Sequence, residues 1–429
     1  MRNELRITAG LAALGLALAA AGCGSALRPQ SPPVISRGVP ARETAADPRP
    51  FGAADTAFGL GVLGAWCRAD PRANLVLSPA SLATGLGMAY LGARGGTAQA
   101  MDTVLRLPSA GGPALASGLQ ARSAALRGLD SPGVTLAESD QVWADPSLRT
   151  RPSYLNAVAT GYGAGVGQVP LLSRPDQAAQ EINQAVAADT RGEIPQLLSP
   201  GSLRNIGWVL TDALYLRAAW ATPFQASQTS PGPFSTAAGR QVSASYLHGG
   251  DYRMTRAGGW TAVSLPYRGG KLAMVALLPS AGAGGCPMPD AAALSSITAR
   301  LAAPGPAGPP GDPGRTAIAL PKVNLSSRAS MGSILTELGM GLAFSQSADF
   351  TGLSPQACCI GLVEHAATLR VGEQGTVASA ATGVGMGATA VQLEPPPQIT
   401  FDRPYLLLVT ATATGEPLFL ARVANPAAS

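Results

Sequence analysis

Histidine is scarce in this chain of 429 residues, which contains only His248 and His365. A serine hydrolase needs a base beside its nucleophile. The chain also has no G-x-S-x-G motif to hold such a serine at a strand-to-helix turn. His365 lies in an apolar stretch, residues 362–366, which favours a hydrogen-bonded structural histidine over a catalytic one. We therefore predict that the protein is not an enzyme.

The sequence also lacks the motifs of a metal, nucleotide or cofactor site. It has no CxxC pair, no Cys/His zinc spacing, no HExxH and no P-loop. Residues 59–64 fit G-x-G-x-x-G, but no strand is predicted before them, so we interpret them as part of a glycine-rich helix. Paired carboxylates in a shared apolar setting are not evident either. We expect no cofactor and no metal.

Lysine is nearly absent, with only Lys271 and Lys322 in the chain. The formal charge of +5 therefore comes from arginines, which are scattered along the sequence. A nucleic-acid-binding protein gathers its positive charge into a stripe or patch. The charge here predicts a solvated surface and no nucleic-acid partner.

No apolar run reaches the length of a membrane span, but the first 23 residues have the features of an export signal. Arg2 and Arg6 precede an apolar stretch, residues 7–22, which ends at Cys23. The sequence A-A-G-C at 20–23 resembles a bacterial lipoprotein cleavage box, although such boxes more often have leucine at the position of Ala20. We expect lipidation at Cys23, with ordinary signal cleavage as the alternative.

Export would place the protein in the cell envelope as a lipid-anchored protein, or outside the cell, and its membrane contact would be through the N-terminal lipid alone. That compartment is oxidising. Four cysteines remain beyond the leader, and their pairing stays open here. Adjacent Cys358 and Cys359 would bridge each other only with strain, and a pair with Cys67 or Cys286 is an alternative.

The rest of the chain divides into a linker and one domain. Residues 24–50 are rich in Pro, Arg, Ala and Ser without a hydrophobic period, which predicts a flexible tether. Residues 51–429 form the predicted domain, with a Pro/Gly surface loop at 303–314. Helical periodicity occurs early, at 81–91, and strand patterns come later, at 272–277, 318–325, 406–410 and 418–423. This order predicts an α+β fold with a large, mostly antiparallel sheet.

Four groups of motifs, in a fixed order, carry the strongest signal. The first is N-L-V-L-S-P-A-S-L at 74–82 with G-A-R-G-G-T-A at 92–98. The others are D-A-L-Y-L at 212–216 with Trp220 and L-P-Y at 265–267; L-P-K-V at 320–323 with A-D-F-T-G at 348–352; and His365 with E-Q-G-T at 373–376, F-D-R-P-Y at 401–405 and F-L-A-R-V at 419–423. Each is weak alone, but in this order they make the chain resemble the serpin family over most of residues 51–426.

The resemblance implies a serpin fold with a central sheet and an exposed reactive loop, about residues 373–400. It implies a single-use inhibitor whose loop is cut by a serine protease, which is held as an acyl-enzyme while the loop inserts into the sheet as a new strand. The partner would be a serine protease, and we expect the inhibitor to be a monomer. The alternative is a non-inhibitory serpin-fold binding lipoprotein.

The loop sequence suits insertion into a sheet. Residues 376–391 contain no proline and no charge, and alternate small residues would share one strand face. Val377 replaces the acidic residue usual in the family, and Gly383, Gly385 and Gly387 are poor strand residues. We therefore expect a stoichiometry of inhibition above one. The resemblance assigns the hinge to Glu373, Gly375, Thr376, Ala378, Ser379, Ala380 and Ala381.

The bond that a protease would cut stays open between two positions. Counting forward from the hinge gives Thr389–Ala390, whereas counting back from Phe401 gives Leu393–Glu394. No lysine or arginine occurs between Thr376 and Arg403, and a trypsin-like pocket requires a cation. We expect elastase-, subtilisin- or chymotrypsin-like targets.

The resemblance also implies residues that control sheet opening. Ser78, Ser81 and His365 match a polar cluster where the central strands part, and Asp212 stands where the family usually has asparagine. Glu373 and Lys322 match an ion pair at the top of the opening, with Trp220 packed nearby. An exposed lysine and a solvated glutamate are the plain alternative for that pair.

Overall fold

The computed structural model describes residues 32–108, 112–302, 314–376 and 398–428, and Pro33–Ser429 forms one compact unit. The predicted signal segment with Cys23 lies outside the described residues. So do residues 377–397, which include Ala378, Ser379, Ala380, Ala381, Thr389, Ala390, Leu393 and Glu394. None of the helices in the described ranges is both long and apolar enough to span a membrane.

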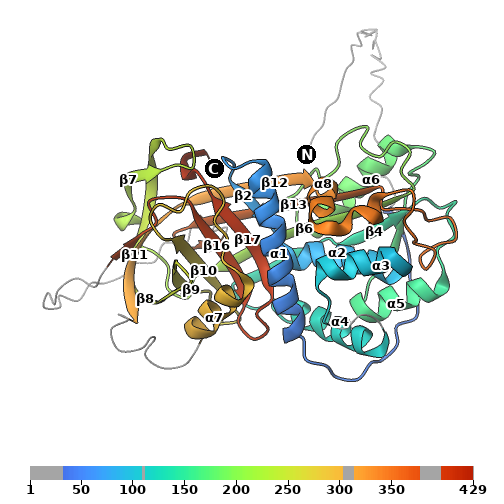
Figure 1. Ribbon diagram of the computed structural model, residues 1–429, viewed down its shortest axis with the longest axis horizontal. Coiled ribbons are helices and arrows are strands. Elements are labelled where there is room, and N and C mark those ends of the chain that lie inside the picture. The colour runs from blue at the N-terminus through green and yellow to red at the C-terminus, as the bar shows by residue number, and fades with distance from the viewer. Residues whose placement is uncertain (1–31, 109–111, 303–313, 377–397, 429) are drawn as a thin grey trace, which may run out of the picture. The chain divides into compact units, whose positions relative to one another are not determined.

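Two large sheets organise the fold, as the α+β prediction required (Figure 1). The central sheet has the order β1-β5-β4-β6-β14-β13-β12, and β3 also pairs with β6. Its pairs are mostly antiparallel, but β6 and β13 run parallel, as do β4 and β5. The strands are β1 (Val34–Ser36), β3 (Val134–Glu138), β4 (Gln141–Ala144), β5 (Val166–Gln168), β6 (Trp208–Ala219), β12 (Val323–Ser330), β13 (Leu362–Gly372) and β14 (Gly375–Thr376).

The second sheet has the order β15-β11-β8-β9-β10-β16-β17-β2, and β7 pairs with β8. In β10, β16 and β17 every residue is buried, as expected for strands covered on both faces. The strands are β2 (Leu75–Leu77), β7 (Ser230–Ser235), β8 (Gln241–Ala257), β9 (Trp260–Pro266), β10 (Leu272–Pro279), β11 (Arg315–Pro321), β15 (Gln398–Thr400), β16 (Tyr405–Ala411) and β17 (Pro417–Val423).

Helices cover the central sheet on both faces. The alternation of side chains along β6 explains this: Leu210 packs into the core that α1, α2 and α5 share, whereas Val209 and Ala213 pack with α6. The α2 helix is buried on nearly all sides, which explains its lack of amphipathic patterning. The helices are α1 (Arg49–Ala69), α2 (Pro79–Gly92), α3 (Gly95–Leu105), α4 (Gly112–Arg127), α5 (Pro152–Tyr162), α6 (Pro175–Asp189), α7 (Ala291–Ala302) and α8 (Gly332–Leu335).

The prediction of a flexible tether over residues 24–50 is wrong for its C-terminal part, which begins with β1. Strand β1 adds to the edge of the central sheet through β5. Beyond it, the Val39 and Ala41 amides each donate to a side chain of α5, at 2.8 Å, and α1 begins at Arg49. Composition missed this segment because edge pairing uses backbone groups, so it needs no hydrophobic period; Val34 is 70% exposed.

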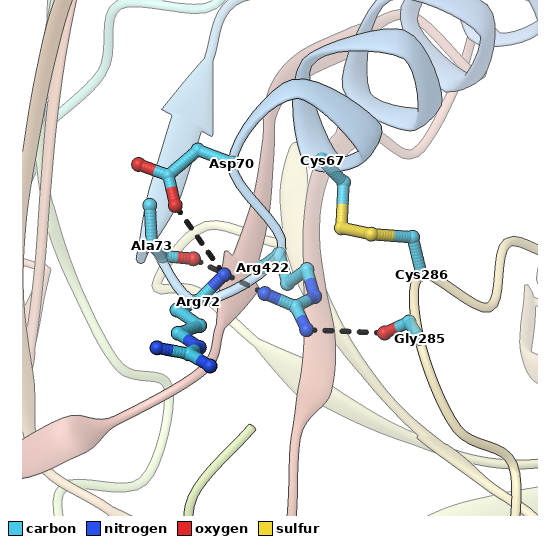
Figure 2. Close-up of a disulfide and its surroundings, with 7 residues drawn as sticks. All are labelled: Cys67, Asp70, Arg72, Ala73, Gly285, Cys286 and Arg422. Carbon is cyan, nitrogen blue, oxygen red and sulfur yellow. Dashed lines mark hydrogen bonds between the residues drawn. A yellow bond between two sulfur atoms is a disulfide. The ribbon is translucent and has the colours of Figure 1, made fainter. Parts of the chain in front are cut away.

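One disulfide resolves the cysteine pairing that the sequence left open. Cys67, at the end of α1, is bonded to Cys286, which precedes α7, and their Cα atoms are 5.9 Å apart (Figure 2). Arg422 reinforces the junction by donating to the carbonyls of Ala73 and Gly285. Cys358 and Cys359 remain free thiols.

Candidate sheet-opening site and loop hinge

The start of the predicted reactive loop lies inside the central sheet. Gly375 and Thr376 form β14, which pairs antiparallel with the end of β6 on one side and the end of β13 on the other. Below this point β6 and β13 pair directly with each other, from Val209 and Leu362 to Tyr215 and Thr368. The hinge therefore occupies the upper end of a seam that is closed farther down.

The backbone at the hinge requires glycine at position 375. Gly375 has a φ of +147°, and a Cβ there would lie 2.1 Å from the Ala218 carbonyl oxygen. Thr376 is fully buried, and its hydroxyl shares a 2.6 Å hydrogen bond with the hydroxyl of Tyr267. Close packing at Gly375 and one buried polar contact at Thr376 thus fix the start of the predicted reactive loop.

Trp220 holds this hinge at its upper end, close to where the resemblance placed it. Its indole stacks on the Tyr267 ring with centroids 4.5 Å apart, and its Nε1 donates to the Gly372 carbonyl at 2.9 Å. Its backbone amide donates to the Gln374 carbonyl at 2.9 Å. Tyr267 belongs to the L-P-Y motif at 265–267, but the sequence predicted no role for it. Its contact with Thr376 depends on the strand register, which no local pattern reveals.

The structure brings Lys322 and Glu373 together at the top of the seam. Lys322 Nζ lies 2.8 Å from Glu373 Oε1, which also accepts a hydrogen bond from Thr229 at 3.0 Å. Partial burial raises the pKa of Glu373, but the hydrogen bonds from Lys322 and Thr229 outweigh it and the net pKa is lowered. The lysine side chain is 40% exposed, so the pair contributes little stability.

A buried polar cluster lies across the closed part of the seam. His365 of β13 is directly opposite Asp212 of β6, and its Nδ1 lies 2.5 Å from Asp212 Oδ1. The Ser78 amide donates to His365 Nε2 at 3.2 Å. Because a backbone N–H only donates, Nε2 carries no proton and the ring is a neutral imidazole that donates from Nδ1. Ser78 also caps α2, accepting from the Ser81 amide at 3.1 Å.

The cluster includes a carboxylate that sequence reasoning missed. The Ser81 hydroxyl donates to Asp140, which precedes β4, and the neighbouring Ser139 amide pairs with β6 at Ala213. Asp140 Oδ2 and Asp212 Oδ2 are both buried, and neither has a hydrogen-bond partner among the described residues. Two carboxylates therefore share this buried site, contrary to the interpretation of the sequence, because the pairing of β4 with β6 brings together residues 72 positions apart in the chain.

The charge of Asp140 predicts a pH-dependent stability. Burial, followed by the charges of Asp212 and Glu138, raises the pKa of Asp140 well above its usual range, and the hydrogen bond from Ser81 and the charge of Arg122 only partly oppose this. An unfolded aspartate has a pKa of about 3.9. The folded state therefore holds a proton that the unfolded state has lost, and stability decreases as the pH rises through the folded pKa.

We expect Asp140→Asn, which mimics the protonated acid, to be more stable than the wild type at pH 8 and to lose this advantage near pH 4. A tenfold difference in a protonation equilibrium corresponds to about 1.4 kcal/mol, and we expect the gain at pH 8 to reach at least that. Urea unfolding across this range measures it, with the exposed Asp130→Asn as control. A constant difference at all pH values would contradict the assignment.

Comparison with known proteins identifies the family. Residues 53–426 match the family model described as serpin (serine protease inhibitor). The chain is a serpin. It is 30% identical over 360 residues to an uncharacterized serpin-like protein of Thermococcus kodakarensis, covering 82% of this chain and 81% of that one. It is 28% identical over 387 residues to the leukocyte elastase inhibitor of Bos taurus, covering 87% of this chain and 99% of that one.

Solved structures show the same serpin fold. The native-state structure of the thermophilic serpin tengpin aligns with a TM-score of 0.77 at 20% identity, covering 92% of this chain and all of that one. Uncleaved ovalbumin aligns with a TM-score of 0.73 at 20% identity, covering 88% of this chain and all of that one. The serpin fold predicted from the motifs is confirmed, and so is membership of a family of protease inhibitors.

Proposed function

We propose that this serpin inhibits serine proteases as a suicide substrate, by loop cleavage, acyl-enzyme trapping and loop insertion. The observation that carries the proposal is the position of β14. The uncleaved chain already has its first loop residues, Gly375 and Thr376, between the ends of β6 and β13. Extension of that strand toward the lower seam would separate β6 from β13. The small loop residues would then lie between these two strands and pair with both.

The covalent step needs nothing from this chain except a peptide bond. The protease serine attacks the carbonyl carbon of the cut residue, the peptide C–N bond breaks, and the new amine leaves on the C-terminal fragment while the N-terminal fragment stays esterified to the serine. Loop insertion then carries that ester away from the hinge. The protease stays trapped only if loop insertion is faster than hydrolysis of the ester by water.

The seam offers a barrier that insertion must cross. The Asp212–His365 contact joins β6 to β13, and the Ser78 amide ties His365 to the start of α2. An incoming strand must break both contacts. The cluster therefore keeps the uncut protein closed and sets how fast the cut loop can enter.

The proposed targets follow from the loop sequence. Between Thr376 and Arg403 the chain has no lysine or arginine, so neither Thr389–Ala390 nor Leu393–Glu394 offers a cation to a trypsin-like pocket. Small or aliphatic residues at these positions suit elastase-, subtilisin- or chymotrypsin-like pockets. A relative with 28% identity is named leukocyte elastase inhibitor, which supports this choice.

A denaturing gel of residues 24–429 mixed with elastase or subtilisin tests the proposal. We expect an SDS-stable band near the summed masses, and mass spectrometry of the released fragment should place the cut between Ala388 and Glu394. Complete cleavage by both enzymes without such a band would overturn the inhibitory mechanism.

Selectivity and stoichiometry can be measured in the same experiment. We expect trypsin to be inhibited at least about tenfold less efficiently than elastase, a difference of about 1.4 kcal/mol, because the loop offers no cation to the aspartate of the trypsin pocket. We also expect more than one inhibitor to be consumed per elastase molecule, because Gly383, Gly385 and Gly387 slow strand formation. Strong trypsin inhibition, or a titration that ends at one to one, would contradict these expectations.

We further propose that the protein is exported and anchored through a lipid on Cys23, as a monomer. The A-A-G-C sequence at 20–23 supports lipidation. The Cys67–Cys286 disulfide supports an oxidising compartment. Cys23→Ser should move the protein from the membrane fraction to the soluble fraction, and unchanged membrane association would contradict the lipid anchor.

A non-inhibitory binding lipoprotein is the second candidate. Its support is the glycine-rich run that contains Gly383, Gly385 and Gly387, because each interior glycine weakens a strand by roughly 0.5–1 kcal/mol relative to alanine. Clean cleavage of the loop without a stable complex on the same gel would favour this function.

A further inference from the structure

Two free thiols of the described residues lie side by side in the loop that leads into β13. Cys358 is exposed and Cys359 is half-buried, and their Sγ atoms are 2.7 Å apart. Neighbouring backbone bonds hold the segment in place: the Ala357 amide donates to Ser354 at 3.1 Å and the Ile360 amide donates to Ala343 at 2.9 Å. The two sulfurs are thus held closer than carbon atoms in ordinary contact, which lie 3.5–4.0 Å apart.

Covalent geometry makes a bond between these sulfurs easy to break. Cα atoms of adjacent residues are about 3.8 Å apart across a trans peptide, whereas disulfides usually join Cα atoms 4.4–6.8 Å apart. Strained and exposed disulfides have more oxidising potentials and are the labile ones. Cys67–Cys286 is the opposite case, since its Cα atoms are 5.9 Å apart and Cys67 is fully buried. The chain therefore carries one structural disulfide and one pair suited to reversible chemistry.

We propose that Cys358 and Cys359 form a reversible dithiol–disulfide site that exchanges with an external disulfide, and that its oxidation state alters the packing beneath the central sheet. In the first step the Cys358 thiolate attacks one sulfur of the external disulfide, forming a mixed disulfide and releasing one thiol. In the second step the Cys359 thiolate attacks Cys358 Sγ, which closes the bridge and releases the second thiol. Two cysteine protons and two electrons pass to the external disulfide, which becomes two thiols.

The environment assigns the order of attack. Burial, followed by the hydrogen bond from Cys358, raises the pKa of the Cys359 thiol to about 12. The exposed Cys358 is accordingly the thiol that meets the external disulfide, and Cys359 is the one that resolves the mixed disulfide. The hydrogen bond between the two thiols is lost once Cys358 is bonded to the external sulfur, which removes one of the causes that raise the Cys359 pKa.

The buried side of the pair contacts the sheet. Cys359 lines a small apolar hollow together with Val142 of β4, Leu210 of β6 and Ala89 of α2. Trp208, at the start of β6, lines the same hollow, and its indole N–H has no partner among the described residues. Bridging draws the Cys359 sulfur toward the exposed Cys358. This movement loosens the packing of Cys359 against β4 and β6. Cys359 lies three residues before β13, which begins at Leu362.

A redox titration of residues 24–429 tests the site and does not depend on protease inhibition. The protein is equilibrated in buffers of reduced and oxidised glutathione, quenched with acid, alkylated and analysed by peptide mass spectrometry. We expect the Cys358–Cys359 peptide to change from doubly alkylated to unalkylated and two hydrogens lighter across the series, while Cys67 and Cys286 stay bonded throughout. Double alkylation in every buffer, or a glutathione adduct that never closes, would overturn the proposal.

The coupling to the sheet has its own measurement. We expect the oxidised protein to unfold at a lower urea concentration than the reduced protein. Cys358→Ser should remove that difference, because a lone Cys359 cannot close the bridge. Equal midpoints for the two redox states of the wild type would overturn the coupling. Thr336→Ser, a conservative substitution that leaves both thiols in place, serves as a control that should keep the difference.

Discussion

Replacing Thr376 by arginine is expected to abolish the proposed loop insertion, so that the protein becomes a substrate of its target protease and no longer traps it. Thr376 is fully buried between β6 and β13, and its hydroxyl forms a hydrogen bond with the hydroxyl of Tyr267. An arginine there would have to bury an unpaired charge, which costs several kcal/mol, or leave the sheet. In the proposed mechanism the strand could then not extend downward, and water would reach the acyl-enzyme before the loop had moved.

The expected result is a fall of at least tenfold in the SDS-stable complex with elastase, while the loop is still cut at the same bond and at a similar rate. Thr376→Ser is the matched control, since it keeps the hydroxyl for Tyr267 and is smaller than threonine; its complex yield should stay within about twofold of the wild type. Undiminished complex formation by the arginine variant would show that insertion does not begin at β14.

The residues of the seam differ in how far the sequence predicted them. Ser78, Asp212 and His365 belong to motifs whose order resembles the family, so the sequence predicts that they lie together. Asp140 could not be expected in the same way, because its neighbours come from the pairing of β4 with β6. Tyr267 belongs to the L-P-Y motif, but its hydrogen bond to Thr376 depends on how far the hinge has entered the sheet.

Features that depend on long-range geometry were the hardest to predict. The Cys67–Cys286 bond spans 219 residues, and no spacing rule distinguished it from a bond to Cys358 or Cys359. The composition of the segment that contains β1 predicts a flexible tether, whereas the backbone groups of β1 pair with β5. The bond cut by the protease stays a prediction, since residues 377–397 lie outside the described structure.

Cutting the loop should make the protein far more resistant to denaturation. In the uncut chain β6 and β13 pair with each other along the lower seam. An inserted strand would hydrogen-bond to both of them and would extend β14 by roughly ten residues. A strand of that length bonded on both sides gains roughly ten hydrogen bonds beyond those that β6 and β13 lose to each other. At about 1 kcal/mol net for each, the gain is on the order of 10 kcal/mol, and three glycines would reduce it by about 2 kcal/mol in all.

Guanidinium unfolding of the uncut protein and of protein cut by a catalytic amount of subtilisin measures this gain. We expect a clear rise of the midpoint on cutting for the wild type and little or no rise for Thr376→Arg, because the arginine blocks the first rung of the new pairing. The pair of proteins separates insertion from a simple loss of strain, since cutting releases the loop in both. An equal rise in both would mean that insertion is not the source of the stability. No rise in the wild type would mean that the seam stays closed after cleavage, and the serpin fold would then serve binding instead of trapping.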